Sequence, residues 1–218
     1  MEPILRTSTT VDWITILLFT SLLFMVMAKS MSYTRFLNFI ILPFNNKYVF
    51  LYNKKDRLMN WFHVFFTLFQ LINGAIFIYL ARGILLDMGR ESYPSVFLFT
   101  LLFLLLFLTT KVLLQLGNGY IFGSKKVISE ILFKKLSYLN YSGILMFLAN
   151  CILCYVLKDS KFVVYAAILG IVLVNAIGWV LALRNHQKFI ASHFFYFILY
   201  LCALEIAPLV IIGSYLNH

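Results

Sequence analysis

The chain has 218 residues, of which 62% are hydrophobic and only 12% charged, and it carries a net charge of +10 at pH 7. This composition and a mean hydropathy of +0.92 exclude a soluble globular domain, in which apolar residues make up about half of the chain and charged residues about a quarter. A strong positive charge is typical of nucleic-acid-binding proteins and of some membrane proteins, and the positions of the basic residues distinguish the two.

Six long apolar runs follow one another along the chain. They cover residues 11–28, 61–81, 94–116, 141–157, 162–183 and 194–215. A helix of about 20 residues crosses the ~30 Å hydrocarbon layer of a membrane, and it satisfies its own backbone hydrogen bonds inside lipid. We therefore predict an all-α integral membrane protein with six transmembrane helices, and residues 1–218 form a single membrane domain. The segment before the first run holds Glu2, Arg6 and Asp12 without a basic cluster, which favours an uncleaved helix over a signal peptide.

The basic residues are divided unequally between the two ends of the predicted helices. With alternating loops, 13 of the 18 fall on one side: Lys29, Arg35, Lys47, Lys54, Lys55, Arg57, Lys111, Lys125, Lys126, Lys134, Lys135, Arg184 and Lys188. The remaining 5 are Arg6, Arg82, Arg90, Lys158 and Lys161. The positive-inside rule places the richer side in the cytoplasm and both termini outside. Topology therefore explains the net charge, and we expect anionic lipid headgroups on the basic face, not a nucleic acid.

Two shorter stretches on the basic side are predicted as interfacial helices. Residues 33–42 are aromatic and basic, too short to span a membrane, and end before Pro43. Residues 117–123 are glycine-rich and predict a flexible turn, after which Ser124 caps an amphipathic helix that ends near Tyr138. We expect this second helix to be separate from the fourth span.

Glu205 is the sharpest candidate for an intramembrane functional residue. It lies about 11 residues into the sixth run, hence ~16 Å deep, and an ionised carboxylate at that depth is costly. Pro208 cannot donate a hydrogen bond to the carbonyl of Leu204 and so leaves an acceptor beside the carboxyl group. Such a pair suits a proton or a cation, and hydrogen bonding to amides of other helices is the structural alternative.

Amide side chains at similar depth are candidates to complete such a site. Gln70 and Asn73 share a face of the second predicted helix, Asn150 is central in the fourth, and Asn175 lies in the fifth. Amides also join transmembrane helices through hydrogen bonds worth roughly 0.6–2 kcal/mol, and packing is the interpretation we favour. Lys111, about five residues inside the third helix, is expected to extend to the interface.

His63, His186 and His193 fall at the cytoplasmic ends of predicted helices. Three histidines at one level are candidates for metal binding or for acid–base chemistry on a lipid headgroup. They show no H-E-x-x-H spacing and have no accompanying carboxylate, so we expect interfacial histidines and predict no catalytic residue, metal ligand or cofactor. The C-x-x-C pair Cys151 and Cys154 is more typical of packing than of a metal or disulfide.

The sixth run contains Leu-Glu-Ile-Ala-Pro, from Leu204 to Pro208. This segment resembles the C-terminal signature of an uncharacterised family of polytopic inner-membrane proteins from Bacteroidota, known only as a domain of unknown function. The resemblance implies a multi-pass protein of a bacterial inner membrane. It implies no activity.

Three functions remain as hypotheses. The first is a non-enzymatic subunit or assembly factor of a membrane complex, with a membrane protein as partner. The second is a small ion- or proton-coupled transporter in which Glu205 titrates. The third is a lipid-modifying enzyme that uses the interfacial histidines. The small size and the lack of catalytic motifs favour the first.

Overall fold

A computed structural model of the chain describes residues 12–45, 47–53, 60–86, 94–121 and 125–185. These residues form helices and contain no strand. The helices are α1 (Asp12–Met31), α2 (Tyr33–Ile40), α3 (Lys47–Asn53), α4 (Trp61–Leu85), α5 (Pro94–Ile121), α6 (Lys125–Cys151), the π-helical turn η1 (Ile152–Val156) and α7 (Lys161–Asn185). Five helices are long and apolar enough to cross a membrane: α1, α4, α5, α6 together with η1, and α7. They match the first five predicted spans, and the sixth, residues 194–215, lies outside the described residues.

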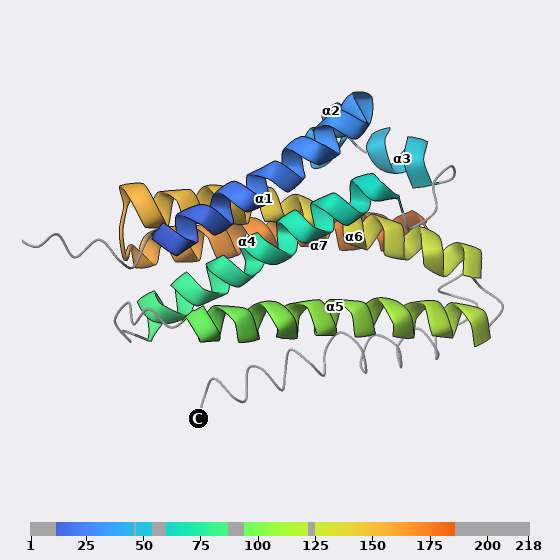
Figure 1. Cartoon of the computed structure of the whole chain (residues 1–218). Helices are drawn as coiled ribbons and strands as arrows, with labels where there is room; N and C mark the ends of the chain where they lie inside the picture. Colours follow the sequence, from blue (N-terminus) through green and yellow to red (C-terminus); the bar gives the residue numbers. More distant parts are fainter. Residues whose placement is uncertain (1–11, 46, 54–59, 87–93, 122–124, 186–218) are drawn as a thin grey trace, which may run out of the picture.

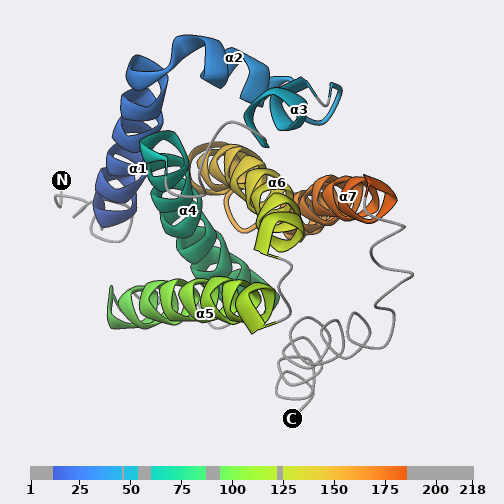
Figure 2. The ribbon, with the colours of Figure 1, turned by 90° about the vertical axis from the view of Figure 1, so that its right-hand side faces the viewer.

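The long helices alternate in direction (Figure 1). Helices α1, α5 and α7 run one way, and α4 and α6 run the other. Helix α4 packs against α1, α5 and α6, and α6 packs against α4, α5 and α7. Figure 2 shows the consequence, with α4 and α6 in the middle of the bundle and α1, α5 and α7 around them.

The short helices α2 and α3 lie at the end of the bundle where α4 and α6 begin (Figure 1). An aromatic cluster holds them there, because the ring centroids of Phe39 and Phe66 are 4.5 Å apart and those of Tyr48 and Phe133 are 6.1 Å apart. Phe39, Phe66 and Tyr48 are fully buried. Helix α2 confirms the helix expected before Pro43, and its placement at the lipid interface stays a prediction.

Basic residues of the described helices collect at this same end. Lys29, Lys125 and Arg184 lie in terminal turns there, whereas Arg82 and the turn that holds Lys158 lie at the opposite end. The charge asymmetry along the chain is therefore an asymmetry in space. Its assignment to the cytoplasm rests on the positive-inside rule.

Two local predictions were wrong. The glycine-rich segment is helical as far as Ile121 and forms the end of α5. There Gly119 packs against Ile128 of α6, and an added Cβ would lie 3.3 Å from the Cβ of Ile128. The amphipathic stretch that follows is no separate interfacial helix but the first half of α6. Its apolar residues Leu132, Phe133 and Tyr138 are buried against the bundle and do not cover a lipid surface. Lys134 of the same stretch is also buried, so the face of α6 that packs in the bundle is not purely apolar.

Candidate functional site

A seam of polar side chains runs along the contact between α4 and α6. On α4 it comprises His63, Thr67, Gln70 and Asn73, whose spacing of three and four residues puts them on one face of the helix. On α6 it comprises Asn140 and Asn150, both fully buried. We call these six residues the α4–α6 seam. The sequence predicted Gln70, Asn73 and Asn150 as candidates, and the structure places all three along the contact between α4 and α6.

Hydrogen bonds cross the seam at two levels. The side chains of Thr67 and Asn140 are joined at 3.2 and 3.3 Å. Deeper in the bundle, Nδ2 of Asn150 donates to the backbone oxygen of Asn73 at 3.0 Å. Because no water competes inside a bilayer, such bonds fix one helix against its neighbour.

Small residues close the seam by letting backbones approach. A Cβ added to Gly143 of α6 would lie 2.9 Å from the Cα of Gln70, which is shorter than the ~3.5–4.0 Å of ordinary carbon contacts. On the other side of α6, a Cβ on Gly178 of α7 would lie 2.5 Å from Cγ of Tyr138. Helix α6 is therefore locked between α4 and α7, and the contact with α4 at Gly143 leaves no room for a passage.

Three buried oxygens of the seam have no hydrogen-bond partner within the described part of the chain: Oε1 of Gln70, Oδ1 of Asn73 and Oδ1 of Asn150. An unpaired buried acceptor costs about 1–3 kcal/mol. Acceptors of this kind suit an added donor, a water or a small cation. The sequence offered no sign that three amides would leave their oxygens unpaired together.

His63 is buried at the basic end of the seam, with 2% of its surface exposed. Its Nε2 is 3.1 Å from the hydroxyl of Tyr48 in α3, and its ring centroid is 4.7 Å from that of Phe133. The expected interfacial histidine is thus enclosed by aromatic rings and connects α3 to α4. His186 and His193, predicted at the same level, lie outside the described residues.

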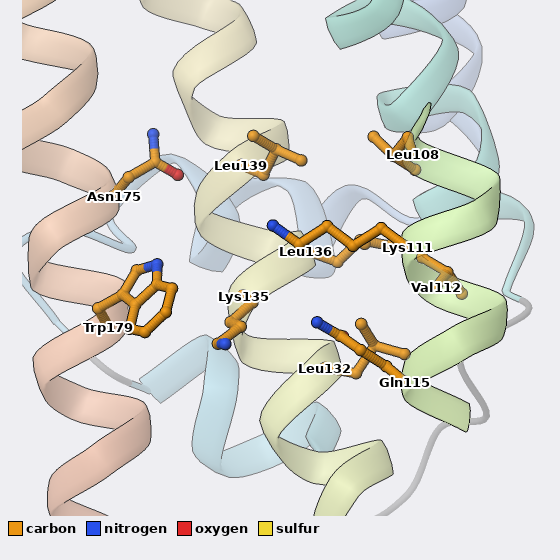
Figure 3. Close-up of a pocket in the computed structure, with 10 residues that line it drawn as sticks. All are labelled: Leu108, Lys111, Val112, Gln115, Leu132, Lys135, Leu136, Leu139, Asn175 and Trp179. Carbon is orange, nitrogen blue, oxygen red and sulfur yellow. The ribbon is translucent and has the colours of Figure 1, made fainter. Parts of the chain in front are cut away.

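A second polar site, which we call the cationic pocket, lies between α5, α6 and α7 (Figure 3). It has a volume of about 90 Å³. Its polar lining residues come from all three helices: Lys111 and Gln115 from α5, Lys135 from α6, and Asn175 and Trp179 from α7. The ammonium of Lys135 lies 3.9 Å from the ring centroid of Trp179, a cation–π contact.

Lys111 does not adopt the conformation expected from the sequence. Figure 3 shows its side chain extending across the pocket toward α7, not along α5 toward the basic end of the bundle. Lys111 lies six residues before Gly117, where the apolar part of α5 ends, which corresponds to ~9 Å along the helix. The pocket therefore holds a positive charge inside the spanning part of the bundle.

A wider apolar groove of about 440 Å³ lies beside the pocket, between α4 and α5. Leu108, Val112 and Leu136 line both cavities and form their common wall. His63 and Thr67 of the seam also line the groove. The α5–α6 contact thus separates a cationic cavity from an apolar one.

The remaining candidates are divided between places. Asn175 lies in the cationic pocket and not in the seam, with its Nδ2 bonded to the oxygen of Ile171 at 2.8 Å. Glu205 and Pro208 lie outside the described residues. Cys151 and Cys154 are not joined in a disulfide, and across the described ranges no three His, Cys, Asp or Glu side chains group as metal ligands would.

Sequence reasoning missed Thr67 and Asn140 of the seam, and Gln115, Lys135 and Trp179 of the cationic pocket. The sequence held a signal for Thr67, because it continues the spacing of His63, Gln70 and Asn73 on α4. No such signal existed for the pocket, since its residues come from three helices and meet only in the folded bundle.

The described residues define a polytopic α-helical protein of the membrane-spanning class, with a polar seam in its interior. The chain belongs to the family described as "Domain of unknown function (DUF4271)", which matches residues 14–216. No curated protein and no solved structure has significant similarity to the chain.

Proposed function

We propose that this protein is a non-enzymatic subunit or assembly factor of a complex in a bacterial inner membrane. The observation that supports it best is that the polar residues of α4 and α6 lie in a closely packed contact between the two helices. A transported solute needs a polar passage, whereas α4 and α6 approach to backbone contact at Gly143 and are joined by hydrogen bonds at two levels. The seam therefore suits a rigid support for other membrane proteins.

The outer helices provide the surface for such a partner. Phe99, Leu106 and Leu113 of α5 and Leu169 and Val180 of α7 are each at least 61% exposed. Lipid tails or helices of another protein match these side chains equally well. The shape of this surface therefore does not identify the partner, which must be found by analysing which proteins copurify with the chain.

The test is purification of the tagged full-length chain from its native host in mild detergent, followed by mass spectrometry. The expected result is one membrane protein in a near-stoichiometric ratio in independent preparations, and a fall in the amount of that protein when the chain is deleted. Elution of the chain alone, together with unchanged levels of membrane complexes in the deletion strain, would contradict the proposal.

Ion or proton coupling is a second candidate, and the three unpaired oxygens of Gln70, Asn73 and Asn150 favour it. A protonated Glu205 would be a suitable donor to one of them. In proteoliposomes with an imposed pH gradient, wild-type protein should dissipate the gradient faster than Glu205→Gln. Equal rates for wild type, Glu205→Gln and empty vesicles would rule this candidate out.

A further inference from the structure

We propose that the cationic pocket binds the phosphate of an anionic phospholipid from the cytoplasmic leaflet. The pocket is distinct from the α4–α6 seam, and the proposal does not depend on the function assigned to the protein. Lys111 and Lys135 supply the two positive charges, from different helices, and the lining residues include no acidic side chain.

Geometry supports an anion between the two lysines. Figure 3 shows Lys111 reaching across from α5 and Gln115 directed into the same space, while Lys135 and Trp179 form the opposite side. Two ammonium groups line one small cavity, and an anion placed between them is attracted by both. The volume of about 90 Å³ is sufficient for a phosphate group.

Location identifies the anion as a lipid headgroup. The pocket lies within the spanning helices near their basic ends, and basic pockets between transmembrane helices on the cytoplasmic side are sites for anionic headgroups. Trp179 and Lys135 are residue types that sit at the headgroup level. Next to the pocket, Leu139 of α6 and the exposed Val172 of α7, which lies one turn before Asn175, offer an apolar path for acyl chains toward the bilayer centre.

Tryptophan fluorescence provides a direct test, because Trp179 lines the pocket. Replacing Trp13 and Trp61 by Phe leaves Trp179 as the sole tryptophan of the three in the chain. This full-length reporter is reconstituted in phosphatidylcholine vesicles with a fixed fraction of either brominated phosphatidylglycerol or brominated phosphatidylcholine. Stronger quenching by the anionic lipid gives its relative affinity for the pocket.

The expected result is a preference for phosphatidylglycerol that falls about fivefold in Lys111→Gln and about fivefold in Lys135→Gln, the factor that corresponds to ~1 kcal/mol per lysine at a membrane surface. Lys111→Arg keeps the charge and should keep the preference, which separates loss of binding from misfolding. Lys126→Gln is the matched control, since Lys126 is exposed on α6 and does not line the pocket.

Two outcomes would overturn the proposal. If Lys126→Gln lowers the preference as much as Lys111→Gln, the effect is one of general surface charge. If both brominated lipids quench Trp179 of the reporter equally, the pocket has no preference for the anionic lipid.

Discussion

The tightest contact of the seam makes the sharpest prediction. Gly143→Ala adds a Cβ that would lie 2.9 Å from both Cα and Cβ of Gln70. Ordinary carbon contacts are ~3.5–4.0 Å long, so α4 and α6 must separate by roughly 0.6–1 Å. The bonds between Thr67 and Asn140, one turn away at 3.2 and 3.3 Å, would then exceed hydrogen-bonding distance.

The cost follows from these two effects. Overpacking of a well-packed interior costs about 1–3 kcal/mol, and an interhelical hydrogen bond in a membrane contributes a further ~0.6 kcal/mol. For a chain of this size, 1 kcal/mol corresponds to a shift of about 2–4 °C in the midpoint of thermal unfolding. Gly143→Ala should therefore lower the midpoint by roughly 3–14 °C.

Gly83→Ala is the matched control, because Gly83 lies in α4 and an added Cβ there would have no other atom within 4 Å. Alanine is the better helix former by about 1 kcal/mol, so this variant should be as stable as wild type or more so. The assay heats the detergent-solubilised protein and measures the monodisperse fraction by size-exclusion chromatography. If Gly143→Ala and Gly83→Ala unfold at the same midpoint temperature, α4 and α6 are not in close contact at Gly143.

Three further predictions concern other contacts. A double-mutant cycle with Thr67→Val and Asn140→Ala should give a coupling free energy of about 0.6–1.7 kcal/mol in thermal unfolding, and strict additivity would show that the two side chains do not interact. Tyr48→Phe removes the hydroxyl bonded to His63, which should cost ~1 kcal/mol and increase proteolysis near α3 while α4 stays protected; unchanged proteolysis would indicate that the aromatic cluster alone holds α3. In a background without native cysteines, Lys126→Cys should react only with reagents that reach the cytoplasm and Lys158→Cys only with external ones, and the reverse pattern would invert the proposed orientation.

Much of the fold was predictable because the bilayer imposes simple requirements. The apolar runs that predicted α1, α4, α5 and α7 differ from the observed helices by a few residues at each end. The wrong predictions concern a segment whose apolar face could pack either against lipid or against other helices. The amphipathic pattern of residues 125–138 suits a lipid interface or a protein interior equally, and only the packing of α6 against α4 and α7 buries Leu132, Phe133 and Tyr138 in the protein.

The candidate site shows the same division. Amides at mid-depth were recognisable, because polar groups in an apolar run are costly and stand out. The sequence did not show which amides would meet, since Asn150 bonds to Asn73 while Asn175 lines the cationic pocket on another side of α6. The direction taken by Lys111 also depends on the cavity in front of it, which three helices create together.

By itself, the sequence determined that the chain belongs to the membrane-spanning class and where its described long helices run, because backbone hydrogen bonding and burial of apolar side chains in lipid are properties of a single segment. It also determined the separation of charge between the two ends of the bundle. Tertiary structure alone decided that α4 and α6 enclose a polar seam and that Lys111 and Lys135 share a pocket. Those features depend on the rotation of each helix about its own axis, which is set by close contacts such as Gly143 on Gln70 and not by hydropathy.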